Sequence, residues 1–200
     1  MAARIWLIRH GETDWSRTGR HTGRTDLPLT ANGEQVAATL APTVRQLSPE
    51  LVLCSPLERA RRTAELAGLE PDELTSDLLE WDYGAWEGRT TAEIREEQRD
   101  PHWLIWDHPV PGGSTPGEQL DEVAVRVERV IAHCAPVLDS GRDCVLIAHG
   151  HVLRILTARW LGLPPIDGRL FALDAGRLSA LGFEHQTRTI TLWNSASATL

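Results

Sequence analysis

The sequence predicts an α/β fold: a three-layer sandwich in which helices cover both faces of a mostly parallel central sheet. Three short apolar runs have the composition of buried strands, and polar residues or glycine follow each run: residues 4–8, 51–54 and 143–148. Segments with apolar residues at helical spacing separate these runs, and this alternation favours a parallel sheet covered on both faces. The 200 residues, 42% of them hydrophobic, suffice for one core, so we expect a single domain over residues 1–200.

The first half of the chain contains two predicted helices. Thr30 is a typical N-cap residue for the first of them. The apolar residues that follow at helical spacing are Val36, Ala37, Leu40, Val44 and Leu47. Pro42 lies inside this run and is expected to kink or break the helix. A second helix is predicted from Leu57 to Ala67, closed by Gly68.

A long helix is predicted in the second half of the chain. Residues 115–118 have the form of a capping box, with Pro116 at the first helical position. The apolar face of this helix comprises Leu120, Val123, Ala124, Val127, Val130, Ile131 and Cys134. Two interpretations of its end stay open: Val137 and Leu138 extend the apolar face, or Pro136 ends the regular helix before them.

The remaining segments differ in regularity. Residues 152–160 have helical spacing, and the residues after them alternate as two or three short strands around Gly176 and Gly182. In contrast, residues 96–117 contain four prolines and two tryptophans and cannot form a long regular element. This stretch is either a lid that closes over a pocket or a surface loop pinned by its tryptophans.

Composition excludes several classes of protein. The net charge of −8 argues against nucleic-acid binding, although clustered arginines can still make a local positive pocket for an anionic substrate. The chain has no lysine, which excludes Schiff-base chemistry. No apolar run reaches transmembrane length and the N-terminus lacks a signal-peptide pattern, so we expect a cytoplasmic protein with no membrane partner. The three cysteines lack metal-type spacing and are expected to be reduced and buried.

Histidines follow two of the three predicted strands. Arg9 and His10 come directly after the first strand, and His149 comes directly after the third. Ligands of open α/β sheets bind at the carboxyl ends of strands, so these side chains are expected at the site. A cation beside an imidazole suits chemistry on an anion, above all a phosphoryl group.

Several blocks of sequence then identify a known family. They are Arg-His-Gly-Glu-Thr at residues 9–13, Trp15-Ser16, the run from Thr22-Gly23 to Gly33, Ser-Pro-x-x-Arg-Ala-x-x-Thr at residues 55–63, Glu80 with residues 84–88, and His149-Gly150. In this order, from about residue 4 to about residue 156, the chain resembles the histidine phosphatase superfamily, which contains cofactor-dependent phosphoglycerate mutases and many small phosphatases. The resemblance implies a phosphoglycerate mutase-like fold.

The resemblance also implies the roles of particular residues. His10 matches the nucleophile, Glu80 the proton donor, and Arg9 and Arg59 the two arginines that clamp the phosphoryl group. His149 matches the second histidine, which bonds the phosphoryl oxygens. Further substrate contacts are expected from Ser16, Thr22, Gly23, Tyr83 and Gly150.

Some neighbouring residues have a more ordinary interpretation. Arg61 and Arg62 are expected to be helix-surface charges, and Glu12 is expected to support the turn after the first strand. Asp82 and Glu87 are the alternatives to Glu80 as the proton donor.

Cofactor chemistry is not expected. The chain has eight histidines, including His149 and His151, but no His-Glu-x-x-His motif or comparable metal-ligand pattern. It has no Gly-x-x-x-x-Gly-Lys-Ser/Thr loop either, which excludes a P-loop kinase or ATPase. We therefore predict a site without metal or organic cofactor.

The predicted activity is hydrolysis of small phosphate monoesters, sugar phosphates among them, so the expected partner is a small phosphorylated metabolite. The alternative is a cofactor-dependent phosphoglycerate mutase. However, the chain lacks, between Gly88 and Thr115, the basic, tyrosine-bearing insertion of the mutases. A hypothesis of another class is a non-catalytic phospholigand-binding protein, which the presence of both His10 and Glu80 disfavours. A homodimer stays open.

Overall fold

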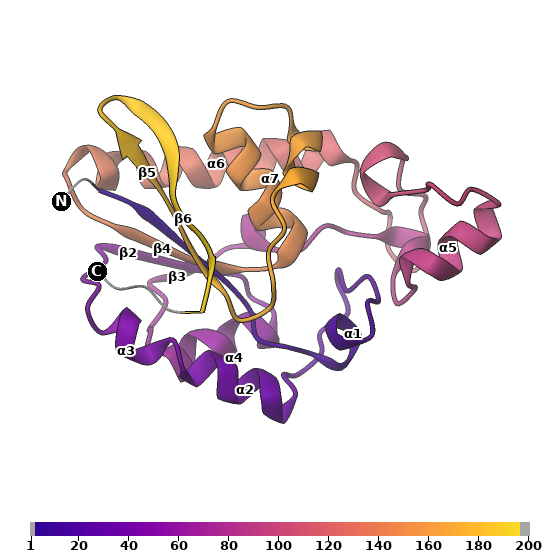
Figure 1. The fold of residues 1–200 in the computed structure, drawn as a ribbon, viewed down its shortest axis with the longest axis horizontal. Helices are drawn as coiled ribbons and strands as arrows, with labels where there is room; N and C mark the ends of the chain where they lie inside the picture. Colours follow the sequence, from indigo (N-terminus) through magenta and orange to yellow (C-terminus); the bar gives the residue numbers. More distant parts are fainter. Residues whose placement is uncertain (1–2, 197–200) are drawn as a thin grey trace.

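The computed structural model describes residues 3–196, and within them the strands form one six-stranded sheet in the order β3-β2-β4-β1-β5-β6 (Figure 1). The strands are β1 (Ile5–Arg9), β2 (Leu51–Cys54), β3 (Glu73–Leu74), β4 (Cys144–Ala148), β5 (Leu178–Glu184) and β6 (Thr187–Ser195). Neighbours among β3, β2, β4 and β1 pair in parallel, whereas β5 pairs antiparallel with β1 and with β6. The mostly parallel sheet of an α/β fold is confirmed.

Helices cover both faces of this sheet. They are α1 (Asp14–Arg17), α2 (Ala31–Ala38), α3 (Ala41–Val44), α4 (Glu58–Ala67), α5 (Thr91–Gln98), α6 (Leu120–Asp139) and α7 (Gly150–Trp160). Short 3₁₀ turns are η1 (Ser76–Leu78), η2 (Gly84–Trp86), η3 (Ile105–Asp107) and η4 (Pro165–Leu170). In Figure 1, α2, α3 and α4 lie on one side of the sheet, and α6 and α7 lie on the other.

Two hydrophobic cores make the three layers. Side chains alternate between the faces of a strand, so Ile5 and Leu7 of β1 join the core under α6 and α7, whereas Trp6 and Ile8 join the core over α2, α3 and α4. The other central strands, β2 and β4, divide their side chains in the same way. Burial on both faces explains why these strands read as continuous apolar runs in the sequence.

The first predicted helix breaks at the expected place. Thr30 caps α2 by accepting a bond from Gly33 N–H, and α2 ends at Ala38. A separate short helix, α3, then starts at Ala41 with Pro42 in its first turn. The helix after β2 is α4, which Gly68 closes in a left-handed conformation at φ +78°.

The predicted start of the long helix is wrong. Helix α6 begins at Leu120, and its capping box consists of Gln119 and Glu122. Residues 115–118 do not join the helix because Gly117 has a φ of +76° and the Thr115 hydroxyl donates to a carboxylate oxygen of Asp82. At its other end α6 continues through Pro136 to Asp139, which settles the open choice in favour of extension.

The segment before α6 is irregular but well packed. Helix α5 was not predicted, although its own capping box, Thr90 with Glu93, is present in the sequence. Beyond α5, Trp103 and Trp106 are 2% and 7% exposed. Both tryptophans are therefore buried, as expected if they pin a surface loop to the rest of the protein. Motion of this stretch as a lid stays a prediction. The segment after α7 forms two strands, and Gly182 lies inside β5.

The fold places the predicted site residues at one edge of the sheet. The Arg9 end of β1 lies beside the Ala148 end of β4, and His10 N–H donates to the Ala148 carbonyl at 2.9 Å. In Figure 1, α1 and α5 lie beyond this edge. No helix within residues 3–196 is long and apolar enough to span a membrane.

Candidate active site

His10 lies at the floor of a cavity of about 270 Å³ and is only 4% exposed. Its Nδ1 lies 2.6 Å from the carbonyl oxygen of Gly11, which can only accept, so the proton of the neutral ring is on Nδ1 and Nε2 keeps a lone pair. Burial lowers the pKa of His10 well below its usual value, and the charges of Arg59 and Arg9 lower it further. The ring is therefore a neutral imidazole with the electron pair that a nucleophile needs.

Arg9 supplies positive charge beside this ring. It lines the same cavity, and its Nη1 donates to the Leu173 carbonyl. Its Nε is buried and has no hydrogen-bond partner within the described residues. A buried N–H of this kind is costly unless an acceptor reaches it, and a phosphoryl oxygen would satisfy it.

The neighbouring glycine allows Arg9 to lie against the start of α7. A Cβ on Gly150 would lie 3.2 Å from the guanidinium carbon of Arg9. Gly150 is also among the residues that line the cavity. A side chain at this position would compete with the arginine for the same space.

Glu80 is the carboxylate that reaches the cavity, and its position is fixed by backbone groups. It accepts hydrogen bonds from the N–H groups of Trp81, His151 and Val152 at 2.9–3.0 Å. Two of these donors belong to the first turn of α7, where unpaired N–H groups and the helix dipole favour a negative charge. Glu80 is therefore held at the wall of the cavity that contains the His10 ring.

The alternatives to Glu80 are occupied elsewhere. Asp82 accepts bonds from Gly84 N–H and from the Thr115 hydroxyl. Glu87 accepts the N–H groups of residues 23 and 25. Neither carboxylate lines the cavity.

Arg59 and His149 lie behind His10, and both are fully buried. The two histidine rings are 5.1 Å apart between centroids. Arg59 Nε donates to His149 Nδ1 at 3.0 Å, so the proton of His149 is on Nε2 and is donated to the Ser55 hydroxyl at 2.7 Å. Neither residue lines the cavity.

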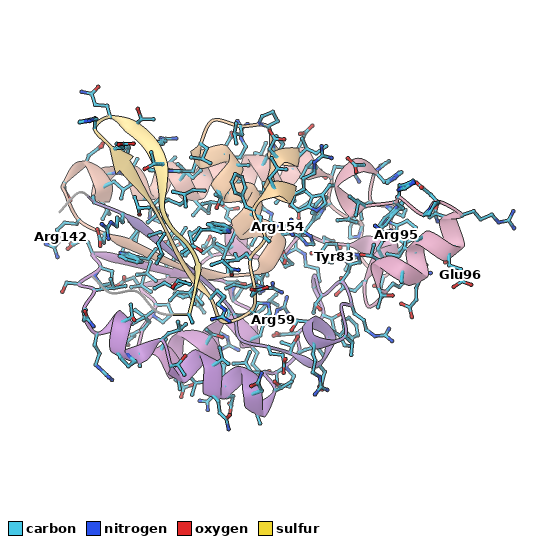
Figure 2. All side chains as sticks on the ribbon, in the orientation of Figure 1. Arg59, Tyr83, Arg95, Glu96, Arg142 and Arg154 are labelled. Carbon is cyan, nitrogen blue, oxygen red and sulfur yellow. The ribbon has the colours of Figure 1, made fainter. Side chains whose placement is uncertain are left out.

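The remaining nitrogens of Arg59 hold a loop. They donate to the carbonyls of Thr22, Gly23 and Thr25 at 2.8–3.2 Å. Figure 2 shows Arg59 near the middle of the molecule, with Arg154 and Tyr83 above it in this view. The guanidinium thus contributes charge from beneath the His10 ring and fixes the loop that follows α1.

The predicted substrate contacts divide into two groups. Ser16, Thr22 and Tyr83 line the cavity, as Gly150 does. Gly23 does not, because its N–H donates to Glu87 at 2.9 Å and its side-chain position faces the Trp81 carbonyl. The Tyr83 hydroxyl shares a hydrogen bond with His151 Nδ1. Burial raises the pKa of Tyr83 well above its usual value, with Glu80 and Glu87 acting in the same direction, so the phenol stays protonated.

Several lining residues were missed by the sequence analysis. They are Gly19, Arg20, His21, Thr91, Leu104, Ile105, Trp106, His151, Arg154 and Leu173. Arg154 had a detectable signal, since it is a charged residue between the apolar Leu153 and Ile155 in a mostly buried helix. For the residues of η3, the sequence analysis offered residues 96–117 as a lid over a pocket or a pinned loop, but it did not say which of their side chains reach the cavity.

The predictions for Glu12, Arg62 and the three cysteines are confirmed. The Thr30 hydroxyl donates to Glu12 at 2.7 Å, so Glu12 supports the turn after β1. Arg62 pairs with Glu34 at 2.8 Å on the surface of α4. The three cysteines are free and buried. Among the described residues, no group of three or more His, Cys, Asp and Glu side chains could hold a metal ion.

Known proteins are similar to this chain in sequence and in fold. The chain is 39% identical to an acid phosphatase of Mycobacterium tuberculosis over 94% of this chain and 91% of that protein. It is 34% identical to an adenosylcobalamin/alpha-ribazole phosphatase of Escherichia coli over 96% of each. The solved structure of an open reading frame of Mycobacterium tuberculosis superposes with a TM-score of 0.89 at 39% identity, covering 97% of this chain and 98% of that one.

Residues 5–196 match the family described as the histidine phosphatase superfamily (branch 1). The match spans nearly the whole chain, and named phosphatases are among its relatives. The phosphoglycerate mutase-like fold agrees with that of the solved relatives. The chain therefore belongs to the histidine phosphatase superfamily and is an enzyme of the phosphatase class.

Proposed function

We propose that this protein hydrolyses small phosphate monoesters through a phosphohistidine formed on His10. The observation that carries the proposal is the hydrogen bond from His10 Nδ1 to the Gly11 carbonyl, which leaves the lone pair of the neutral imidazole on Nε2. This ring shares a cavity with the Arg9 guanidinium and the Glu80 carboxyl group. Nucleophile, cation and carboxyl group are the parts that phosphoryl transfer to water requires.

The first step breaks the ester bond. His10 Nε2 attacks phosphorus, and a P–N bond forms as the bond to the leaving oxygen breaks. Arg9 neutralises the charge on the phosphoryl oxygens, which the unpaired Nε–H of Arg9 can reach. Protonated Glu80 gives its proton to the leaving oxygen, so the alcohol departs neutral, and the N–H groups at the start of α7 stabilise the carboxylate that this transfer leaves.

The second step transfers the phosphoryl group to water. Water attacks phosphorus, the P–N bond breaks, and Glu80, now a carboxylate, accepts the proton of that water. Products are inorganic phosphate and free His10. Contact of His149 with the phosphoryl oxygens requires that it exchange Ser55 for the substrate, because both ring nitrogens have partners. Arg59 and His149 otherwise support the site from behind.

Phosphate release from simple esters tests the proposal. The purified protein should release inorganic phosphate from small phosphate esters without a bisphosphoglycerate primer, and His10→Asn should abolish this release. His102→Gln, at an exposed histidine outside the cavity, is the matched control and should keep full activity. Interconversion of 3- and 2-phosphoglycerate with little phosphate release would assign the protein to the mutases instead.

Chelation tests the absence of a metal cofactor. Arg9 and the charge of Arg59 neutralise the phosphoryl group without an ion, so we predict that phosphate release is unchanged after treatment with EDTA. Loss of activity in EDTA that a divalent ion restores would show that the mechanism uses a bound metal.

A further inference from the structure

Thr63 ends the block of residues 55–63, lies on α4 and is fully buried. Its hydroxyl makes two hydrogen bonds whose directions are fixed by their partners. The Arg59 carbonyl, one turn earlier in α4, can only accept, so it receives the hydroxyl proton at 2.7 Å. The Gly11 N–H can only donate, and it donates to the Thr63 oxygen at 3.0 Å. The hydroxyl therefore connects α4 to the peptide group that follows His10.

Hydrogen bonds hold the backbone on both sides of His10. His10 N–H donates to the Ala148 carbonyl at 2.9 Å, and the His10 carbonyl accepts from Gly176 N–H at 2.9 Å. The next N–H along the chain, that of Gly11, donates to Thr63. The first two partners are main-chain groups, so among the described residues Thr63 supplies the one side-chain partner of these backbone groups. It is therefore the partner that a substitution can remove.

Gly11 contacts the reacting ring through its carbonyl group. The carbonyl oxygen lies 2.6 Å from His10 Nδ1 and selects the tautomer that leaves the lone pair on Nε2. Gly33 limits the space around Gly11, because a Cβ on Gly11 would lie 2.5 Å from the Gly33 carbonyl oxygen. Without the Thr63 hydroxyl, the buried Gly11 N–H would lack an acceptor, which is costly. Rotation of the peptide toward another acceptor would then move the Gly11 carbonyl away from Nδ1.

We propose that Thr63 is a positioning residue for His10: its hydroxyl holds the Gly11 N–H and thereby keeps the Gly11 carbonyl on His10 Nδ1. This inference rests on the proposed function, in which His10 Nε2 attacks phosphorus. Thr63 does not line the cavity and acts on the reaction through Gly11. Loss of the hydroxyl should therefore slow transfer of the phosphoryl group to His10 and leave binding of phosphate nearly unchanged.

Two pairs of proteins isolate the effect of the hydroxyl. Thr63→Val keeps the shape of the wild-type side chain without the hydroxyl, and Thr63→Ser and Thr63→Ala differ from each other only in the hydroxyl. The second pair decides the test where Thr63→Val does not fold. Rapid quench with ³²P-labelled substrate measures the rate of His10 phosphorylation. This rate should fall by about 10- to 100-fold in Thr63→Val and Thr63→Ala, as expected for one buried donor left unpaired.

Rescue and binding complete the kinetic test. Thr63→Ser should keep most of the wild-type rate of phosphorylation, although it loses the same methyl group as Thr63→Ala. The inhibition constant of inorganic phosphate, used as a competitive inhibitor, should stay near the wild-type value in all three variants. The loss should thus appear in the rate of phosphorylation and not in the affinity for the anion.

Thr157 provides a matched control on α7. It is also fully buried, and its hydroxyl donates to the Leu153 carbonyl at 2.8 Å, as the Thr63 hydroxyl does to Arg59. Within residues 3–196 no N–H donates to the Thr157 oxygen, and Thr157 does not line the cavity. Thr157→Val should therefore keep the wild-type rate of phosphorylation.

NMR of the His10 ring tests the positioning role without turnover. In the wild type and in Thr63→Ser, the ¹⁵N shifts at neutral pH should show a proton on Nδ1 and a lone pair on Nε2. In Thr63→Val and Thr63→Ala, the shifts should move toward the average of the two neutral tautomers. A purely structural role of Thr63 would lower the free energy of unfolding without moving these shifts.

Two kinds of result would overturn the inference, and they differ from each other. If Thr63→Ala phosphorylates His10 as fast as Thr63→Ser, or if the ¹⁵N shifts of His10 are the same in both, the hydroxyl does not position the ring, while the proposed hydrolysis stands. If the wild type releases phosphate from no ester, p-nitrophenyl phosphate included, the proposed function fails and the role of Thr63 fails with it.

Discussion

Glu80 illustrates how the backbone fixes a single side chain for chemistry. Three N–H groups, two of them from the first turn of α7, hold its carboxyl oxygens, so its position follows from where that helix begins. His10 depends on a carbonyl in the same way, because the Gly11 oxygen selects the tautomer of its ring. In both residues, local backbone geometry decides which atom faces the cavity.

Replacement of Glu80 tests its role as an acid. Glu80→Gln retains the shape of the side chain but cannot donate a carboxylic proton, so esters with poor leaving groups should slow by about 10²- to 10⁴-fold. Activated aryl phosphates leave without a proton and should slow far less. A plot of kcat/KM against leaving-group pKa should therefore become much steeper in the variant; an equal loss across the series would remove Glu80 from this role.

Sequence motifs predicted which residues belong to the site, but not which hydrogen-bond partners surround each of them. His10, Glu80 and Arg9 were predicted and share a cavity, because each belongs to a block next to a strand end or a buried loop. Arg59 and His149 are expected in contact with the phosphoryl group; neither lines the cavity, and this contact stays a prediction. Their partners are backbone carbonyls and the Ser55 hydroxyl, which no sequence motif specifies.

At the scale of elements, regular segments were predictable and loop-built ones were not. Strands β1, β2 and β4 and helices α4 and α7 have apolar patterns strong enough to locate them within one or two residues. The start of α6 was misplaced because the Thr115 hydroxyl serves Asp82 instead of capping a helix. Whether Thr115 caps a helix or bonds Asp82 depends on a side chain that is distant in the sequence, and a short-range capping pattern does not include that side chain.

The loop that carries Glu80 is tied to α6 by one buried arginine. Arg126 donates to both oxygens of Glu118 at 2.7 and 3.0 Å and to the carbonyls of residues 77 and 79. Arg126→Met would remove the nearest partner of the Glu118 carboxylate, which keeps Arg24 at 3.6 Å, and would leave two carbonyls unpaired, so we expect the free energy of unfolding to fall by about 3 kcal/mol. Urea denaturation followed by circular dichroism measures this loss.

A matched control lies one turn along the same helix. Arg129 pairs with Asp77 on the exposed surface, so Arg129→Met should reduce the free energy of unfolding much less than Arg126→Met does. Equal losses in the two variants would show that the buried network contributes no more than a surface pair.

The whole molecule combines a negative net charge with a positive cavity and a group of uncharged buried histidines. The chain carries −8, yet the residues lining its site include three arginines. Burial is the first cause that lowers the pKa of His10, His149 and His151 well below the usual value and that of His21 to about 4. These four side chains stay neutral in the folded protein at pH values where they gain protons in the unfolded chain.

Acidification should therefore destabilise the fold at a pH where carboxylates are still ionised. A histidine whose pKa is lowered on folding stabilises the protein above the unfolded value near 6.5, and this contribution is lost as the pH falls below it. For four such groups the free energy of unfolding should drop by roughly 4 kcal/mol between pH 6.5 and pH 5.5. Urea titrations at pH 7.5, 6.5 and 5.5 measure this change in the free energy of unfolding.

Two variants separate the buried histidines from the exposed ones. His133→Gln, at a histidine that is 48% exposed, should leave the pH dependence unchanged. His21→Asn should reduce it, because one buried group no longer gains a proton on unfolding. A free energy of unfolding that is constant from pH 7.5 to pH 5.5 in the wild type would contradict this account.

The central claim is that the phosphoryl group passes through His10, and trapping the intermediate tests it most directly. Enzyme mixed with ³²P-labelled substrate and quenched within milliseconds should carry label that is stable in base and released in acid, as expected of a P–N bond. Peptide mapping should locate the label at His10, and His10→Ala should carry none, whereas His102→Gln should label like the wild type. An enzyme that turns over its substrate while no phosphoprotein forms at any quench time would contradict the account.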